Sequence, residues 1–223
     1  MTILKTLLCA AACGHAALAG AQQTELARLY AAQPPAGAAF VRAVNATGQP
    51  LRVALGAGAA EQELAPRGRI ASAYRVVDAA RPLALTVNGA AAGAPLTLAP
   101  DTFASVVVRA AGTGHTLQTI ADTAGNRDGL RAELRFYNLA PACVARLALA
   151  DGAAVFEQVA EGQSRQRAIN PVAATVVGQC GDGAGQRLTL PALKAADHYS
   201  IFLLGGAVLA GQLAQTEPYQ GAR

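Results

Sequence analysis

The chain has 223 residues, of which 14% are charged and 4% are aromatic, with no Trp and a formal net charge of +4. This length suits one large domain or two small ones, whose cores must consist of Ala, Leu and Val rather than aromatic rings. The basic residues are nearly all arginines and are scattered, without the clustered basic patch of nucleic-acid-binding proteins.

Residues 1–21 have the pattern of a secretory signal peptide: a lysine, an apolar run, and small residues at Ala19 and Ala21. We expect cleavage after Ala21 and export to the periplasm. Neither Cys9 nor Cys13 has the leucine three positions earlier that lipidation requires. No later apolar run is long enough to cross a bilayer, so we expect no transmembrane segment in the mature chain.

Residues 22–39 form an extended lead-in, held open by Pro34 and Pro35. Residues 40–120 then alternate short apolar runs with turn signals such as Asn88-Gly89, which is typical of a β-sandwich. The strands expected in this first domain are Phe40–Asn45, Leu51–Leu55, Ile70–Val77, Leu83–Val87, Leu96–Leu98, Phe103–Arg109 and His115–Ile120.

Residues 121–129 lack apolar periodicity and are the expected linker. A second β-sandwich is predicted over 130–215, followed by a C-terminal tail over 216–223. Its expected strands are Leu130–Asn138, Cys143–Ala150, Ala154–Val159, Arg165–Ile169, Val172–Val177, Arg187–Leu190, Tyr199–Leu204 and Ala207–Leu213.

Two segments of the first half resemble two segments of the second half. Val41 to Asn45 aligns with Leu134 to Asn138, apolar on apolar, Arg on Arg and Asn on Asn, 93 positions apart. The runs that begin at Asp101 and Asp197 both lead from a turn into an apolar strand, 96 positions apart. We therefore predict an all-β fold of two tandem small β-sandwich domains of related topology, preceded by a cleaved signal peptide.

The segment Leu130–Asn138 alternates with the period of a half-buried strand. Its even positions, beginning with Leu130, are predicted core, and Phe136→Ala is expected to cost about 3 to 5 kcal/mol. The odd positions are predicted to face outward, where alanine would leave folding nearly unchanged. The candidate partner- or polysaccharide-binding residues are three of this outward set and the arginine of the upstream twin: Arg131, Arg135, Tyr137 and Arg42. The alternative is a solvated strand face.

Once the signal peptide is removed, the remaining cysteines are Cys143 and Cys180. An even pair in an oxidising compartment predicts a disulfide. Closing that loop would stabilise the second domain by roughly 4 kcal/mol. Two separately buried thiols remain the alternative, and no ligand spacing supports a zinc site.

Catalytic chemistry has little support in the sequence. None of the serines lies in a Gly-x-Ser-x-Gly elbow. His198 follows Asp197 directly, and neighbouring side chains of an extended strand point to opposite faces, so this pair is more typical of a turn than of a catalytic dyad. The loop Gly181–Gly185 precedes a strand and not the helix of a phosphate site. Acidic residues show no calcium-loop pattern. We expect no enzyme activity, no cofactor and no metal.

Several segments, in order along the chain, resemble the AlgF family of periplasmic alginate O-acetylation proteins. They are Leu29-Tyr30, the Pro-Pro-Ala-Gly lead-in, Ala39-Phe40-Val41-Arg42 with Asn45, Leu134 to Asn138, and Ile169-Asn170-Pro171. The resemblance runs from about Leu29 to about Ala214. It implies an exported protein of two β-sandwiches that is needed for exopolysaccharide O-acetylation without being the acetyltransferase. The cysteine pair departs from the family's pattern.

The first functional hypothesis is therefore a non-catalytic periplasmic adaptor. It would link a membrane O-acyltransferase and a periplasmic acetyltransferase that modify a secreted polysaccharide such as alginate. The alternatives are a carbohydrate-binding module for an acidic polysaccharide, an O-acetylation subunit acting on cellulose, an acetyltransferase, and a pilus-type chaperone, which shares only the two-sandwich architecture.

Overall fold

The computed structural model describes residues 35–122, 129–205 and 208–217. Within these residues the chain forms sixteen strands, β1 to β16, and no α-helix. The predicted signal peptide lies outside the described residues, as do most of the lead-in, of the linker and of the tail.

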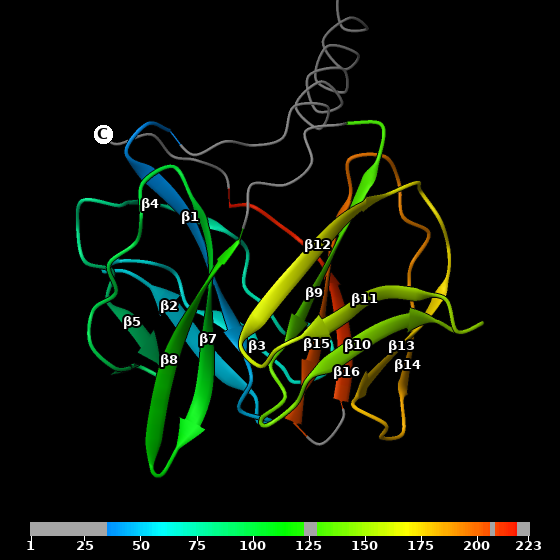
Figure 1. The fold of residues 1–223 in the computed structure, drawn as a ribbon. Coiled ribbons are helices and arrows are strands. Elements are labelled where there is room, and N and C mark those ends of the chain that lie inside the picture. Colours follow the sequence, from blue (N-terminus) through cyan, green and yellow to red (C-terminus); the bar gives the residue numbers. More distant parts are fainter. Residues whose placement is uncertain (1–34, 123–128, 206–207, 218–223) are drawn as a thin grey trace, which may run out of the picture.

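The first eight strands form a β-sandwich of two four-stranded sheets, drawn from blue to green in Figure 1. One sheet has the order β4-β1-β7-β8 and the other β3-β2-β5-β6. In the first of these sheets β1 and β7 are parallel, while the other neighbours are antiparallel. The strands are β1 (Ala38–Asn45), β2 (Leu51–Leu55), β3 (Gln62–Leu64), β4 (Arg75–Asp78), β5 (Leu85–Val87), β6 (Ala90–Ala91), β7 (Phe103–Ala111) and β8 (Gly114–Asp122).

The last eight strands repeat this arrangement. Their sheets have the orders β12-β9-β15-β16 and β11-β10-β13-β14, and β9 and β15 are the parallel pair. The strands are β9 (Ala132–Asn138), β10 (Ala145–Leu149), β11 (Ala154–Val159), β12 (Gln163–Ile169), β13 (Thr175–Cys180), β14 (Gln186–Thr189), β15 (His198–Leu204) and β16 (Val208–Leu213). The predicted fold class, all-β with two sandwiches of related topology, is confirmed.

A pair of asparagines shows how closely the two domains correspond. Asn45, at the end of β1, accepts a hydrogen bond from the backbone of Thr47 and donates to the carbonyls of Gln49 and Leu64. Asn138, at the end of β9, does the same: its oxygen accepts from the backbone N–H two residues ahead, and its amide donates to the carbonyls of Cys143 and Val159. Each asparagine therefore fixes the same turn between the two sheets of its sandwich.

The two domains pack against each other through equivalent sheets, which we call the inner sheets: β4-β1-β7-β8 and β12-β9-β15-β16. Each domain has its own aliphatic core between its inner and outer sheet. A third core lies between the inner sheets and contains residues of both domains. Its buried members are Val44, Ile70, Ala71, Val107, Ile120, Tyr137, Leu139, Phe202, Leu204 and Ala210.

Several predicted elements differ from the structure. The short strands β3 and β6 were not predicted, because runs this brief carry no clear period. Between Ile70 and Val77 only Arg75 onward is strand, and Leu96 forms an isolated bridge to Leu83. Leu130 lies before β9 and is 77% exposed, so its assignment to the core is wrong. Ala132, Leu134 and Phe136 are buried as predicted.

The predicted disulfide is present. Cys143 and Cys180 are bonded, with a separation of 5.3 Å between their Cα atoms. Cys180 ends β13, and its register partner Ala145 begins β10. The bond therefore fixes the ends of two neighbouring strands in the outer sheet of the second domain.

Candidate functional site

The structure separates Arg131 from the other three predicted binding residues. Arg131 is exposed, whereas Arg42, Arg135 and Tyr137 are 1%, 7% and 0% exposed. The alternation along β9 was interpreted correctly, but its second face is covered by the inner sheet of the other domain. The prediction that these three residues form an exposed surface is therefore wrong. Their binding role stays a prediction.

Arg42 lies at the centre of the interface between the domains. Its Nε donates to Ser105 Oγ of its own domain at 2.9 Å. Its Nη2 donates across the interface to Tyr137 Oη at 2.8 Å and to Ser200 Oγ at 2.9 Å. Rings from both domains surround the guanidinium carbon, with centroids at 4.6 Å (Tyr74), 5.3 Å (Tyr137) and 5.5 Å (Phe202). Hydrogen bonds and cation–π contacts together replace the water that this cation loses.

Asp122 supplies a negative charge to the same interface from the end of β8. Its Oδ2 accepts from Tyr74 Oη at 2.9 Å and from Ser105 Oγ at 2.7 Å. Its Oδ1 accepts from Tyr137 Oη at 2.7 Å and lies 3.4 Å from Arg135 Nη1. Tyr137 and Arg135 belong to the second domain, so one buried carboxylate binds both domains.

A second carboxylate, Glu133, lies beside this cluster on β9. Its Oε1 is 2.9 Å from Arg135 Nη2 and 3.6 Å from His198 Nδ1. Burial alone would raise the pKa of Glu133, but the hydrogen bond from His198 and the charge of Arg135 lower it to about 2. The two arginines and two carboxylates balance in charge.

The environment also shifts the other ionisable groups. Burial raises the pKa of Tyr137, and it raises that of Tyr74 well above its usual range. Burial alone would lower the pKa of Arg42, but the surrounding tyrosine oxygens and the Asp122 carboxylate outweigh it and raise the pKa. Arg42 is therefore a permanent cation among hydroxyl groups that stay protonated at neutral pH. We refer to Arg42, Tyr74, Ser105, Asp122, Glu133, Arg135, Tyr137 and Ser200 as the interdomain cluster.

The interdomain cluster preserves the internal duplication. Arg42 faces Ser105 across the parallel pair β1–β7, and Arg135 faces Ser200 across the parallel pair β9–β15. The two serines were not predicted as part of a site, although each lies a few residues after one of the repeated aspartates, Asp101 and Asp197. Asp122 was assigned to the linker, because its role depends on contacts with the other domain that no local pattern reveals.

One side of the interface is closed by chain segments that cross it. The side-chain amide of Gln212 on β16 accepts from the backbone N–H of Ala71 and donates to the Ala71 carbonyl, at 3.0 and 2.9 Å. Beyond β16 the chain pairs with Tyr74, whose N–H donates to the Gln215 carbonyl and whose carbonyl accepts from Glu217. Thr216, the bridge partner of Tyr74, and Glu217 belong to the predicted tail, so part of this tail pairs with the first domain.

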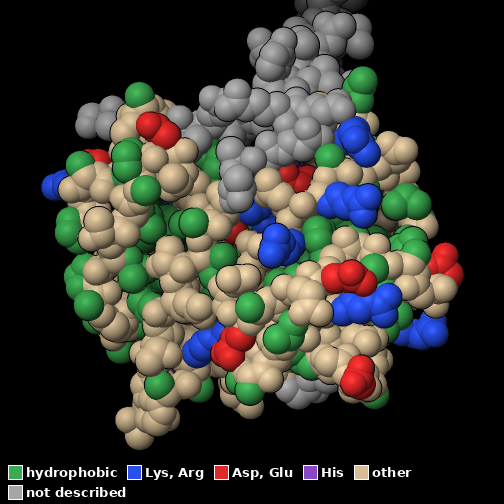
Figure 2. All heavy atoms as spheres, in the orientation of Figure 1, with side chains coloured by type: hydrophobic (Ala, Val, Ile, Leu, Met, Phe, Trp, Pro, Cys, Tyr) green, Lys and Arg blue, Asp and Glu red, His purple; other side chains and the backbone are tan. Residues whose placement is uncertain are grey.

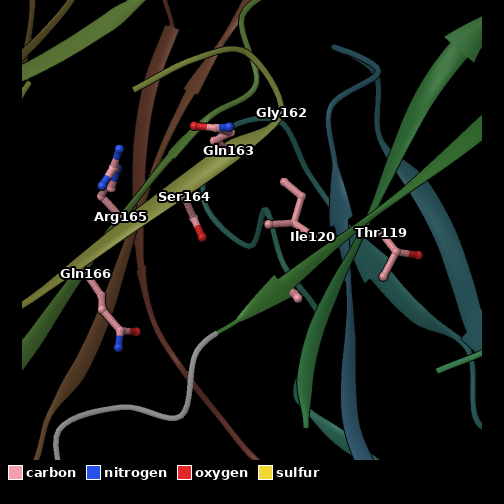
Figure 3. Close-up of a pocket in the computed structure, with 8 residues that line it drawn as sticks. Thr119, Ile120, Gly162, Gln163, Ser164, Arg165 and Gln166 are labelled. Atoms are coloured by element: carbon pink, nitrogen blue, oxygen red, sulfur yellow. The ribbon is translucent and has the colours of Figure 1, made fainter. Parts of the chain in front are cut away.

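The other side of the interface is open and forms a groove between β8 and β12 (Figure 3). The groove has a volume of about 530 Å³ and is lined by 119–121 of one domain and 162–166 of the other. Ser164 points across it toward Ile120, whereas Arg165 lies on the opposite face of β12. At one end Arg109 donates to the Leu139 carbonyl at 2.8 Å and approaches Glu161 at 3.9 Å.

The surface beside the groove carries mixed charge with many arginines. Figure 2 shows basic side chains over β11 and β12, interrupted by a few acidic ones. Arg165 and Arg167 are exposed and alternate along β12. Within the described residues neither of them forms an ion pair. This edge of the second domain therefore presents uncompensated positive charge.

The described residues lack the side-chain groupings typical of a serine nucleophile and of a metal site. No described serine is hydrogen-bonded to a histidine, and Ser105 and Ser200 are occupied by Asp122 and Arg42. The described part of the chain contains no group of three or more His, Cys, Asp or Glu side chains that could hold a metal ion. No helix among the described residues has the length and apolar character needed to cross a membrane.

Three comparisons with known proteins bear on identity. The model of the family described as alginate O-acetyl transferase AlgF matches residues 10–195. A search of curated proteins returned no match. Among solved structures, the chain is similar to CBMbc (family CBM26) from Eubacterium rectale Amy13K in complex with maltoheptaose. That similarity has 8% sequence identity, covers 81% of this chain and 98% of that one, and has a TM-score of 0.26, too low to carry weight.

Proposed function

Because the chain belongs to the AlgF family, whose name implies a role in alginate O-acetylation, we propose that it is a non-catalytic periplasmic adaptor of the acetylation system. In this role it holds acetyltransferase components together and does not transfer acetyl groups itself. The family and the Cys143–Cys180 disulfide indicate an extracytoplasmic protein, and the periplasm is the compartment that this role requires.

The interdomain cluster is the observation that carries this proposal. The buried polar side chains that resemble catalytic groups are occupied in joining the two domains, and their hydrogen bonds run to one another. Such a cluster makes two sandwiches into one rigid body with a fixed outer surface. A rigid surface with two domains is what an adaptor needs, because each partner must be held at a fixed position relative to the other.

The adaptor role is tested by deleting the gene and by capturing partners on the purified chain. Deletion should remove most of the acetyl groups from the secreted polysaccharide, and the wild-type gene should restore them. The immobilised chain should retain a periplasmic acetyltransferase or the membrane O-acyltransferase of the system. Normal acetylation after deletion, or retention of neither protein, would reject the proposal.

The absence of catalysis is tested separately on the purified chain. After incubation with an activated acetyl ester, intact-mass spectrometry should show no acetylated form beyond that of a heat-unfolded control. A stoichiometric adduct on Ser105, Ser164 or Ser200 would instead establish an acetyltransferase. The adaptor and acetyltransferase hypotheses are therefore distinguished by one measurement.

A further inference from the structure

The groove between β8 and β12 has the properties of a site for an extended peptide, and the backbone of β12 shows why. Glu133 of β9 and Leu139, the residue after β9, donate their N–H groups to the carbonyls of Asp197 and Leu203 on the β15 side. Backbone groups alternate in direction along a strand, so Leu134 and Phe136 face β12, where their register partners are Arg167 and Arg165. Ser164 and Ala168, which flank the two arginines, therefore direct their backbone groups away from β9. Among the described strands, β12 pairs with β9 alone.

The side chains of β12 divide between two faces. Arg165 and Arg167 share the face of Leu134 and Phe136, at the open edge of the second sandwich. Ser164 is on the other face and points into the groove toward Ile120 (Figure 3). A strand added beside β12 would therefore place alternate side chains next to the arginines and the others in the narrow space between β12 and β8.

Charge and size then define the occupant. Arg165 and Arg167 have no ion pair among the described residues, so the side chains opposite them should be carboxylates. The alternate side chains must be small or short, because they share the groove with Ser164 and Ile120. No aromatic side chain of the described residues lines the groove, so it lacks the flat platform on which a sugar ring would stack.

We infer that the β8–β12 groove binds an extended segment of a partner protein, in which carboxylates alternate with small side chains, as an added strand along β12. This mode of recognition obtains affinity from backbone hydrogen bonds and selectivity from alternate side chains. The inference rests on the proposed adaptor function and assigns it a surface. Because the walls of the groove come from both domains, binding depends on the interdomain cluster that holds them together.

The test uses the purified chain and a fluorescently labelled decapeptide of alternating Glu and Thr. Binding is measured as the increase in fluorescence anisotropy of the peptide at low ionic strength. The comparison peptides are an alternating Lys and Thr decapeptide and one with the same composition but separate Glu and Thr blocks. We expect binding of the alternating acidic peptide alone. The affinity should fall as salt is added, because exposed charges are screened.

Three variants locate the binding. Replacing both arginines (Arg165→Glu with Arg167→Glu) reverses the charge, and Ser164→Pro removes an outward N–H while the hydrogen bonds to β9 remain. Each of these substitutions should lower the affinity for the alternating acidic peptide by about tenfold or more. The control is Arg187→Glu, because Arg187 is also an exposed strand arginine but lies on β14 in the outer sheet. Thermal unfolding of each variant confirms that it is folded.

Several results would overturn the inference. Equal binding of the block peptide, or equal loss in Arg187→Glu, would show that only unspecific charge is involved. Binding of an oligouronate in place of the peptide would make the groove a sugar site. Normal polysaccharide acetylation and partner capture with the double arginine variant would reject the groove but leave the adaptor intact, whereas normal acetylation after gene deletion would reject the adaptor itself.

Discussion

At the scale of single residues, the alternating pattern around Arg42 correctly places its side chain on the face away from the core of its own domain. The prediction that this face is exposed is wrong. This arginine repeats in both halves and alternates with apolar residues, which suggested an outward, binding arginine. In the structure it is buried and donates to Ser105, Tyr137 and Ser200. A buried arginine with several partners is costly to disturb, because the partners lose their hydrogen bonds without gaining water.

We predict that Arg42→Met destabilises the protein by about 3 kcal/mol, because it leaves buried hydroxyl groups without a donor. The matched control is Arg131→Met, which removes an exposed arginine and should change the free energy of unfolding by about 0.5 kcal/mol or less. Urea denaturation followed by circular dichroism measures both. Equal effects of the two substitutions would contradict the structural role of Arg42.

Glu133 makes the stability of the fold depend on pH in the acid range. Its pKa is about 2 in the folded chain, below its ordinary value of 4.5. A carboxyl group with a lowered pKa contributes its full stabilisation above pH 4.5 and loses it as the pH falls toward 2. Unfolding free energies measured across this range should decline. In Glu133→Gln the decline should be shallower, and an unchanged slope would exclude Glu133 as its source.

The buried tyrosines make the stability of the fold depend on pH in the alkaline range, where stability falls as the pH rises. Burial raises the pKa of Tyr74 and Tyr137 above the ordinary value of 10.0. The folded chain therefore holds these protons more tightly than the unfolded chain, so stability is full below pH 10 and is lost as the pH rises further. Burial also raises the pKa of Tyr199. Absorbance of tyrosinate should therefore show three groups that titrate late, and Tyr74 and Tyr137 should ionise together with unfolding. Normal titration of all tyrosines in the folded chain would contradict this assignment.

At the scale of elements, the parallel pairs β1–β7 and β9–β15 organise the molecule. Each pair places an arginine beside a serine on the face toward the other domain, and aliphatic residues on the face toward its own core. The outer sheets also correspond in strand order, but only the second one carries a disulfide between described residues. The arginine–serine pair of the central strands is therefore common to both domains, whereas the disulfide is not.

Removing the disulfide by Cys143→Ser with Cys180→Ser should destabilise the second domain by roughly 4 kcal/mol, because it frees a loop spanning 37 positions in the unfolded chain. Thermal unfolding of the wild type with added reductant should shift in the same direction as the variant. If reductant shifts the variant as well, the effect would come from something other than this bond.

At the scale of the whole molecule, the third core and the interdomain cluster make two sandwiches into one unit. Without them the chain would be two domains on a linker, with interface residues such as Tyr137 and Phe202 exposed to water. If the two domains moved independently, the distance between two partners bound to them would vary. A rigid adaptor fixes that distance.

We predict that wild-type unfolding is a single transition in which both domains exchange amide hydrogens together. In Arg42→Met with Arg135→Met, the domains should separate and give two transitions, seen by hydrogen exchange and mass spectrometry. The control, Arg131→Met with Arg187→Met, removes two exposed arginines and should keep one transition. Two transitions in the wild type would show that the interface does not couple the domains.

The fold class, the duplication, the buried positions Leu134 and Phe136, and the Cys143–Cys180 bond could all be predicted from the sequence. These follow from local period, from spacing and from the redox compartment, which are all properties of the chain taken alone. The surroundings of the second face of β9 became clear only from the packing of the two domains. Alternation states that Arg135 and Tyr137 share a face, but whether that face meets water or another sheet depends on how two domains pack. For the same reason the groove between β8 and β12, made by edges that are far apart in the chain, has no counterpart in the sequence.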